Sequence, residues 1–336
     1  MKTPAFLLSA ALLLATTAAH AQQLNAASQG RIEFDSYTPK TMFDLARERR
    51  ENWAPQKIWG ELSLPKPAEP AAPVPAMVLM HGSGGIEASM QTWVDAFHAI
   101  GVATFVVSSF EPRGVRRTAE DQTLVPAAAN LVDSLQALQL LATHPRIDPA
   151  RIGVMGFSRG GSVAFQSAVE PLRRAVLKSE LRFALHIPVY AGCGQVYWSP
   201  QLSRAPMLNL VGEADDYTGA AACEQLAAQY AAAGAGIRTI KYAGAHHSWD
   251  GNYPVHLLPQ ATTGIACEVV RWDLANWTLR TEPAGTPIAA AKVGEYFAGC
   301  AKRGVHVGRN DAALRQSRHD ALEFASQVFF GAAPPK

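Results

Sequence analysis

Short apolar segments recur through the middle of the chain, and the spacing between them leaves room for helices. They lie at 76–80 (AMVLM), 102–107 (VATFVV), 151–156 (RIGVMG), 205–212 (APMLNLVG) and 237–242 (IRTIKY). Apolar runs without polar alternation are typical of strands that are covered on both faces. We therefore interpret these five segments as strands of one buried sheet.

The segments between these runs have the length and pattern of helices. Helices are expected at 88–100, 119–143, 158–170 and 219–234, with a terminal amphipathic helix at 315–330. Within the second, leucines at intervals of three, four or seven form one apolar stripe: Leu124, Leu131, Leu135, Leu138 and Leu141. Strands that alternate with helices imply right-handed crossovers and a mostly parallel central sheet flanked by helices on both faces. The predicted fold class is α/β.

Two further strands are expected before this region, at 30–38 (GRIEFDSYT) and 57–65 (KIWGELSLP). A proline-rich stretch at 65–75 follows them. Prolines at this density exclude a helix interior or a central strand. Because too few residues precede it for an independent core, we interpret the stretch as a long hairpin loop and not as an interdomain linker. Residues 22–336 are accordingly predicted to form a single domain.

The first residues have the pattern of a cleavable leader. Met1 and Lys2 precede an apolar run at 5–15, and Ala19-His20-Ala21 has the form of a cleavage site. The apolar run is shorter than the ~20 residues that span a bilayer, which disfavours a membrane anchor. We expect residues 1–21 to be a signal peptide and the mature protein, beginning near Gln22, to be periplasmic or secreted.

The charge balance limits the kinds of molecule that the protein is expected to bind. Thirty basic and twenty-eight acidic side chains are spread without long blocks. This distribution offers no electrostatic footprint for nucleic acid or an anionic membrane surface. The expected partner is a small or neutral molecule, and the sequence does not indicate an oligomeric state.

The four cysteines are Cys193, Cys223, Cys267 and Cys300. An exported chain exposes them to an oxidising compartment, where three complete pairings are open. Proximity favours Cys193 with Cys223 and Cys267 with Cys300, each bridge being worth roughly 3 to 4 kcal/mol by loop entropy. Buried free thiols are the alternative. Zinc is disfavoured because no two of the four have CxxC spacing.

The segment GFSRG at 156–160 places Ser158 at the junction of a buried strand and a helix. This GxSxG arrangement is typical of a nucleophile elbow. So sharp a turn strains the central residue, and its neighbours two residues away, Gly156 and Gly160, must lack bulk. The turn also leaves the hydroxyl at a helix N-terminus, which favours developing negative charge. The alternative is an ordinary N-cap serine.

A nucleophilic serine needs a base and an acid that orients it, and candidates for both follow later strands. Asp215 and Asp216 come after the strand that ends at Gly212, and His246 and His247 follow the next strand. In open α/β sheets the loops beyond the carboxyl ends of the strands build the site. The order nucleophile, acid, histidine is the order this architecture uses.

The first glycine-rich turn supplies candidate oxyanion donors. The segment VLMHGSGG at 78–85 follows a predicted central strand directly. Neither GxGxxG nor GxxxxGK[ST] fits it, so a phosphate-binding loop is excluded. We assign the amide of Ser83, with Gly84 second, and the amide of Arg159 as the donors.

The segments that carry a family resemblance are HGSGG, GFSRGG, VGEADDYT and YAGAHHSWD. Over residues 76–250 the chain resembles the dienelactone hydrolase branch of the α/β-hydrolase superfamily. The resemblance implies the α/β-hydrolase fold, with Ser158 as nucleophile, Asp215 as acid and His247 as base. The namesake enzymes carry a cysteine at the elbow and a nearby glutamate, whereas this chain has serine, and Glu87 lies too far past the turn to match. The resemblance therefore implies a general carboxylic-ester hydrolase.

The predicted function is an exported serine hydrolase that cleaves carboxylic esters through an acyl-enzyme, without a cofactor. A peptidase or an acyltransferase with the same triad, or a non-catalytic binding protein of this fold, remains an alternative. Metal ligation by His246, His247 and Asp250 is disfavoured because adjacent histidines on a loop point apart.

The sequence leaves two alternatives open for each of three features. Trp198 and Trp249 either line an acyl pocket or belong to the core. The Arg159 side chain either selects an anionic acyl group or pairs with a surface carboxylate. Residues 251–299 form either a cap or lid, in which Trp272 and Trp277 shape the access of substrate, or an ordinary surface excursion.

Overall fold

The computed structural model describes residues 22–66 and 72–331, and the predicted leader at 1–21 lies outside the described residues. The helices are α1 (Met42–Ala46), α2 (Ser89–Ala99), α3 (Ala127–Leu141), α4 (Arg159–Gln166), α5 (Glu170–Val176), α6 (Ala220–Ala232), α7 (Val293–Cys300) and α8 (Asp311–Phe330). The strands of the main sheet are β1 (Gly30–Pro39), β2 (Trp53–Ser63), β3 (Val74–Met80), β4 (Ala103–Ser108), β5 (Ile147–Phe157), β6 (His186–Val189), β8 (Met207–Gly212) and β9 (Ile237–Tyr242).

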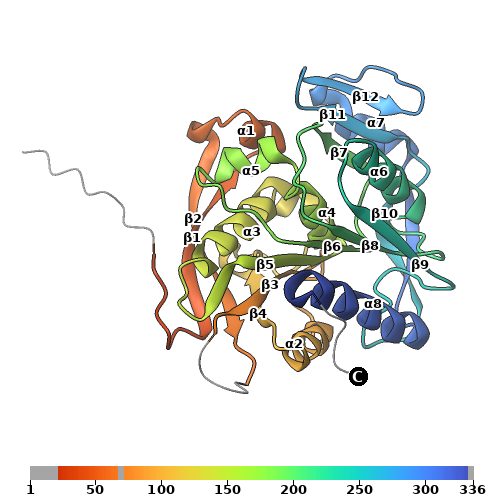
Figure 1. Cartoon of the computed structure of the whole chain (residues 1–336). Helices are drawn as coiled ribbons and strands as arrows, with labels where there is room; N and C mark the ends of the chain where they lie inside the picture. The colour runs from red at the N-terminus through yellow and green to blue at the C-terminus, as the bar shows by residue number, and fades with distance from the viewer. Residues whose placement is uncertain (1–21, 67–71, 332–336) are drawn as a thin grey trace, which may run out of the picture.

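The eight strands form one sheet in the order β1-β2-β4-β3-β5-β6-β8-β9 (Figure 1). β2 runs antiparallel to both of its neighbours, β1 and β4. Every other pair of neighbours is parallel. All five apolar runs are therefore strands of a mostly parallel sheet, as their lack of polar alternation predicts.

Helices cover both faces of this sheet. In Figure 1, α3, α4 and α6 lie on one face, and α2 and α8 lie on the other. Two large apolar clusters fill the space between the helices and the sheet, one on each face. The predicted α/β fold class, a mostly parallel sheet flanked by helices on both faces, is confirmed.

Strand β6 is absent from the five predicted runs. It is only four residues long and reads HIPV, so His186 and Pro188 interrupt its apolar character. It nevertheless lies fully buried between β5 and β8. So short a run becomes recognisable as a strand only through its neighbours.

The helix expected at 119–143 begins later than predicted. Helix α3 starts at Ala127, immediately after Pro126, and a 3₁₀ turn occupies Gln122–Leu124. Leu124 is 54% exposed, whereas Leu131, Leu135 and Leu138 are fully buried. Including Leu124 in the apolar stripe was wrong, because Pro126 has no N–H to continue a helix that starts upstream.

The proline-rich connection is not a hairpin loop. Strands β2 and β3, which it joins, do not pair with each other, because β4 lies between them. Residues 67–71 of the connection lie outside the described residues. The prediction failed because local sequence does not reveal which strand is inserted between two others.

The chain between His247 and α8 contributes strands to two small sheets. Strand β10 (His256–Thr263) pairs with β13 (Lys302–Val307), and β11 (Val269–Asp273) lies between β12 (Thr278–Glu282) and β7 (Gln195–Trp198). Since β7 comes from the central part of the chain, the region 251–299 is tied to the main body by strand pairing.

The structure contains the two disulfides that proximity favours. Cys193 pairs with Cys223, and Cys267 pairs with Cys300. The second closes a loop within the two small sheets, while the first joins the segment after β6 to helix α6. The predicted pairing is confirmed.

Candidate active site

Ser158 lies at the sharp turn between β5 and α4, with φ 55° and ψ −112°. Few residues other than glycine adopt such a positive φ. A Cβ atom on Gly156 would come within 2.0 Å of the Gly160 carbonyl oxygen, and one on Gly160 within 2.1 Å of the Met80 carbonyl oxygen. Both glycines are therefore required by close backbone approach, as the sharp turn predicts.

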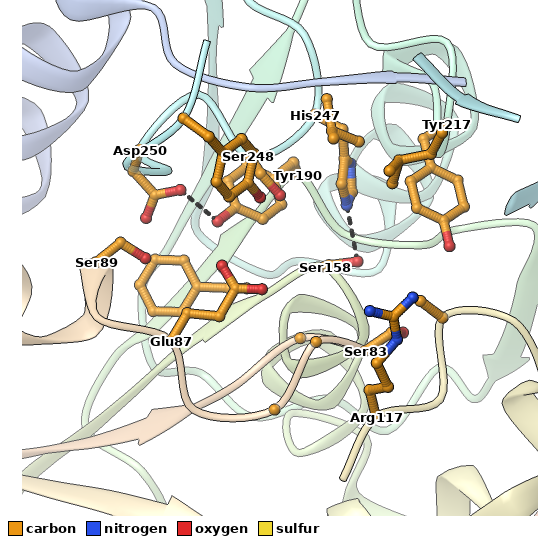
Figure 2. Close-up of a pocket in the computed structure, with 18 of the residues that line it drawn as sticks. Ser83, Glu87, Ser89, Arg117, Ser158, Tyr190, Tyr217, His247, Ser248 and Asp250 are labelled. Atoms are coloured by element: carbon orange, nitrogen blue, oxygen red, sulfur yellow. Dashed lines mark hydrogen bonds between the residues drawn. The ribbon is translucent and has the colours of Figure 1, made fainter. Parts of the chain in front are cut away.

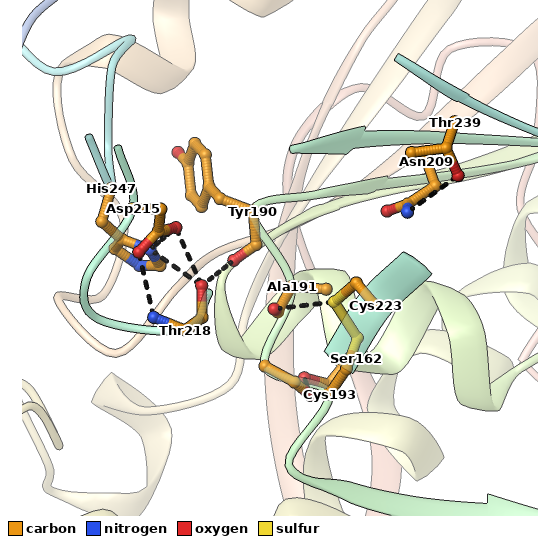
Figure 3. Close-up of a disulfide and its surroundings, with 11 residues drawn as sticks. Ser162, Tyr190, Ala191, Cys193, Asn209, Asp215, Thr218, Cys223, Thr239 and His247 are labelled. Atoms are coloured by element: carbon orange, nitrogen blue, oxygen red, sulfur yellow. Dashed lines mark hydrogen bonds and ion pairs between the residues drawn. A yellow bond between two sulfur atoms is a disulfide. The ribbon is translucent and has the colours of Figure 1, made fainter. Parts of the chain in front are cut away.

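The imidazole of His247 lies between the other two candidate residues (Figures 2 and 3). Its Nε2 is 2.9 Å from Oγ of Ser158, and its Nδ1 is 2.8 Å from Oδ2 of Asp215. His247 and Asp215 are 3% and 8% exposed. The three side chains come from loops that follow β5, β8 and β9, so the carboxyl edge of the sheet brings them together.

Asp215 sits in a cradle of donors. Its Oδ1 accepts the backbone N–H groups of Tyr217 and Thr218 at 2.9 and 3.0 Å, and its Oδ2 accepts the Thr218 hydroxyl at 2.9 Å. Burial acts to raise the pKa of Asp215. The charge and hydrogen bond of His247, together with the hydrogen bonds from Thr218, outweigh burial and lower the pKa of Asp215 to about 2. An ionised carboxylate only accepts hydrogen bonds, so Nδ1 of His247 carries a proton and Nε2 is free to accept one.

Two tyrosine rings hold the imidazole. The ring centroids of Tyr190 and Tyr217 lie 4.7 and 4.8 Å from that of His247. The Tyr190 hydroxyl donates to Oδ1 of Asp250 at 2.6 Å, which fixes that ring in turn. Rotation of the His247 ring away from Ser158 is therefore opposed by packing on both sides.

The glycine-rich turn after β3 packs directly against the elbow. A Cβ atom on Gly82 would lie 3.2 Å from Cβ of Ser158. The Ser83 carbonyl accepts the Thr118 N–H at 2.8 Å. Within the described chain, the amides of Ser83, Gly84 and Arg159 have no hydrogen-bond partner. These amides remain our candidates for oxyanion donors.

The Arg159 side chain takes neither of the two orientations considered from the sequence. Its Nε donates to Oδ1 of Asn130 at 2.6 Å, and its Nη1 donates to the backbone and side-chain oxygens of Gln122 at 3.1 and 2.9 Å. It does not line the cavity beside Ser158. The guanidinium is used to hold the segment before α3 against α4.

A cavity of about 470 Å³ opens beside Ser158. The segments that line it are 82–90, 116–119 and 247–258, with single residues from β5 and β13 and the aromatic residues Trp93, Tyr190 and Tyr217. These rings were not predicted, because Trp93 and Tyr190 lie outside the quoted motifs and the motif VGEADDYT does not indicate where its Tyr217 points. Only their position beside the candidate residues in the fold reveals them.

Neither tryptophan proposed for the pocket lines it. Trp249 is fully buried, and its Nε1 donates to Oγ of Ser317 at 3.1 Å. Trp198 packs on Tyr230, with the Arg271 guanidinium 4.5 Å above its ring. Proximity in sequence to the base and to a strand end was misleading, because both side chains point into the packed layers of the protein.

The segment 251–299 contributes little to the cavity. Only Tyr253, His256 and Leu258 of this segment line it. Trp277 packs against Phe43, 5.6 Å between ring centroids, and beneath Arg47. Trp272 lies against Tyr197. Neither Trp272 nor Trp277 lines the cavity, which favours the ordinary surface excursion of the two alternatives left open by the sequence.

The neighbours of the candidate acid and base, Asp216 and His246, both lie against His306 instead. Asp216 accepts the backbone N–H of His306 at 2.8 Å and lies 2.7 Å from its Nδ1. The ring of His246 lies tilted beside that of His306, with ring centroids 5.6 Å apart. The residues that the structure describes include no group of three or more side chains suited to hold a metal ion.

Comparison with families of known proteins identifies the group to which this arrangement belongs. The model of the dienelactone hydrolase family matches residues 63–261, more than half of the chain. The chain belongs to the dienelactone hydrolase family. It is thus a hydrolase of carboxylic ester bonds. No curated protein matches it.

Solved structures resemble this dienelactone hydrolase family member at low identity. Esterase 2 of the planctomycete Thermogutta terrifontis, phosphorylated by paraoxon, has a TM-score of 0.52 at 16% identity, over 83% of this chain and 91% of the esterase. The propionate-bound form of that esterase has a TM-score of 0.46 at 17% identity, over 57% and 80%. At such identity the first likeness supports the fold alone.

Substitutions of Asp215 and Asp216 are predicted to differ sharply in their effect on kcat. Asp215→Asn removes the charge that holds the His247 proton on Nδ1, whereas Asp216→Asn alters an exposed contact with His306. Steady-state hydrolysis of p-nitrophenyl butyrate should show a loss of about 10⁴-fold in kcat for Asp215→Asn. Asp216→Asn serves as the matched control and should have a small effect. The opposite ranking would contradict the roles assigned to the two residues.

The two disulfides are predicted to differ in their effect on activity. The Cys193–Cys223 bridge ties the segment after β6 to α6, and Thr218, which precedes α6, contacts both Asp215 and the Tyr190 carbonyl oxygen (Figure 3). Replacing either pair by alanines should lower the free energy of unfolding by roughly 3 to 4 kcal/mol. Only the Cys193/Cys223 variant should also lose kcat/KM, and equal losses in both variants would contradict this assignment.

Proposed function

We propose that this protein hydrolyses small carboxylic esters through an acyl-enzyme, with Ser158 as nucleophile, His247 as base and Asp215 as the residue that orients it. The observation that carries the proposal is the unbroken line of contacts from Oγ of Ser158 to Nε2 and from Nδ1 to Asp215, 2.9 and 2.8 Å long, beside the 470 Å³ cavity. Distances of this length suit direct proton transfer.

In the first half of the reaction, Oγ of Ser158 bonds to the ester carbonyl carbon while its proton passes to Nε2 of His247. The imidazolium that forms is stabilised by the Asp215 carboxylate. The bond from the carbonyl carbon to the alcohol oxygen then breaks, and the alcohol leaves with the proton from Nε2. An acyl group remains on Ser158.

In the second half, water takes the place of the alcohol. His247 removes a proton from the water as the hydroxide adds to the acyl carbon, and the same proton returns to Oγ of Ser158 when the acyl bond breaks. The free acid leaves, and the three side chains regain their starting states. No cofactor is needed for this cycle.

The negative charge on the carbonyl oxygen needs donors that are already in place. The amides of Ser83 and Arg159, with Gly84 second, fit because the turn after β3 packs on the elbow and these amides have no other partner among the described residues. Losing one such donor typically costs ~3 to 4 kcal/mol of transition-state stabilisation. The α4 N-terminus favours the same charge.

Export to the periplasm or the medium is part of the proposal, as is a single domain over residues 22–336. The two disulfides support an oxidising compartment. The leader pattern at 1–21 supports cleavage before Gln22. Among the described helices, none has the length and apolar character to cross a bilayer.

Active-site labelling tests the proposal. The Thermogutta esterase is phosphorylated by paraoxon, and we expect one equivalent of a fluorophosphonate or of paraoxon to inactivate this protein. Peptide mass spectrometry should find the adduct on Ser158, and p-nitrophenyl acetate should release a burst of one nitrophenol per site. An adduct elsewhere would overturn the assignment, and no adduct would favour a binding protein. Parallel assays with peptides and added alcohols report a peptidase or an acyltransferase.

A further inference from the structure

The cavity beside Ser158 has two walls of different charge. Figure 2 shows Arg117 and Tyr217 on one side of Ser158, and Glu87 and Asp250 on the other. An ester carbonyl bound at Ser158 therefore has one substituent directed to each side. The second side, which we call the acidic wall, consists of Glu87, Asp250, Trp93, Tyr190 and Tyr253.

Asp250 is a buried carboxyl group held only by neutral donors. It is 3% exposed. Oδ1 accepts the Tyr190 hydroxyl at 2.6 Å, and Oδ2 accepts Nε1 of Trp93 at 2.8 Å. Buried carboxylates are usually paired with a cation. In the described part of the chain no cationic nitrogen lies within 4.0 Å of this one.

Glu87, an exposed residue at the rim of the cavity, adds a second acid to the same wall. Its side chain folds over Gly84, where an added Cβ atom would lie 2.1 Å from Oε1 of Glu87. Its carboxyl group makes no hydrogen bond and no ion pair among the residues that the structure describes. The nearby basic side chains have other partners: Arg117 donates to Glu120 at 2.9 Å, and His247 donates to Asp215.

The pKa values of both acids of this wall are shifted upward. Burial raises the pKa of Asp250. Burial also raises the pKa of Glu87, and the negative charge of Asp250 adds to this effect, while His247 and Arg117 act in the opposite direction without cancelling it. Two acids in one wall favour either a retained proton or a bound cation.

The aromatic residues of the acidic wall supply the other half of a cation site. The rings of Trp93, Tyr190 and Tyr253 border the cavity next to the two carboxyl groups. Trp93 and Tyr190 are 0% and 5% exposed, so the half-buried Tyr253 offers most of the accessible aromatic surface. Aromatic faces beside a carboxylate are the chemistry that recognises ammonium and quaternary ammonium groups. A metal ion is a poorer candidate, because the described residues offer no group of three metal ligands.

We propose that the acidic wall binds a positively charged ammonium group carried by the ester substrate on one side of its scissile carbonyl. This inference rests on the proposed function, because it assigns a substrate class to the same serine. Arg116 and Arg117 also line the cavity, and their charge disfavours a cation on the opposite side. The wall therefore sets the direction in which the substrate binds as well as its class.

The test compares esters that differ only in charge. For the alcohol side, acetylcholine is compared with its neutral isostere 3,3-dimethylbutyl acetate. For the acyl side, the cationic p-nitrophenyl ester of 4-(trimethylammonio)butyrate is compared with the neutral p-nitrophenyl ester of 5,5-dimethylhexanoate. The readout is the ratio of kcat/KM within each pair, so a general loss of activity cancels. We expect the cationic member of one pair to be preferred about tenfold, and the preference to shrink as salt is added.

Variants of Glu87 show whether its charge is responsible. Glu87→Gln should remove most of the preference, and Glu87→Asp, which keeps the charge, should retain part of it. Glu111→Gln, an exposed change outside the cavity, is the matched control and should keep the wild-type ratio. The salt dependence needs no variant and stays informative if a Glu87 variant folds poorly.

The outcomes separate this inference from the proposed function. Cleavage of p-nitrophenyl acetate with no cationic preference in either pair overturns the inference alone. A preference for the cationic ester that persists in Glu87→Gln also overturns the inference alone. Failure to cleave any ester, p-nitrophenyl acetate included, contradicts the proposed function instead.

Discussion

Replacing Ser158 by alanine should lower kcat for p-nitrophenyl butyrate by about 10⁵- to 10⁶-fold, because the acyl-enzyme can no longer form. His247→Ala should cost a similar factor, since the hydroxyl is a poor nucleophile without a base 2.9 Å away. The double variant should be hardly worse than either single one, because the residues act as a unit. Stopped-flow burst titration and steady-state assays measure these effects.

Ser162→Ala provides the matched control for Ser158→Ala. Ser162 lies one turn further along α4, and its Oγ donates to the Gly192 carbonyl oxygen at 2.7 Å, away from the reaction. This variant should keep most of the activity and lose only about 1 kcal/mol of stability. A Ser158→Ala protein that retained a tenth of wild-type activity would refute the role of the serine.

The largest expected effect on stability comes from Asp133. This residue of α3 is fully buried, and Nη1 and Nη2 of Arg113 donate to its two oxygens at 2.7 and 3.0 Å. Ser36 of β1 donates to the same carboxylate at 2.5 Å. Asp133→Ala should lower the free energy of unfolding by about 3 to 5 kcal/mol, because it leaves the Arg113 charge buried without a partner. Chemical denaturation followed by circular dichroism measures the loss.

Two comparisons test the origin of that loss. The double change Asp133→Leu with Arg113→Met should cost less than the sum of the two single changes, since no unpaired charge remains. Asp35 pairs with Lys57 at 3.0 Å on the surface, where the two side chains are 80% and 61% exposed. Asp35→Ala should therefore cost at most about 1 kcal/mol. Similar losses for Asp35→Ala and Asp133→Ala would contradict the argument from burial.

Predictions from the sequence succeeded where the determining contacts are close along the chain. The strands at 76–80 and 151–156 are buried on both faces, so their composition alone reveals them. The strained turn at Ser158 is recognisable because its two glycines lie two residues away. The disulfides followed from proximity, since each pair of cysteines is separated by about thirty residues.

Predictions failed where a side chain on a loop or helix can point either way. Trp249 comes two residues after His247, yet it points into the layer beneath α8. Arg159 comes directly after Ser158 in the sequence, but its guanidinium points away from the site and donates to Asn130, a buried residue of α3. Leu124 has helical spacing but precedes Pro126. In each case the direction depends on what packs against the residue, which local spacing does not specify.

The sequence by itself determined the fold class, the elbow around Ser158 and the positions along the chain at which an acid and a base follow a strand. Each depends on a run of neighbouring residues, through apolar burial or backbone strain. The family resemblance already selects Asp215 and not Asp216 as the acid, and the structure brings Asp215 to His247. Only the tertiary structure set Glu87 in the same wall as Asp250, 163 positions away. The pocket is the part of the protein built from contacts between distant segments, and its chemistry depends on how the loops at the carboxyl edge of the sheet pack together.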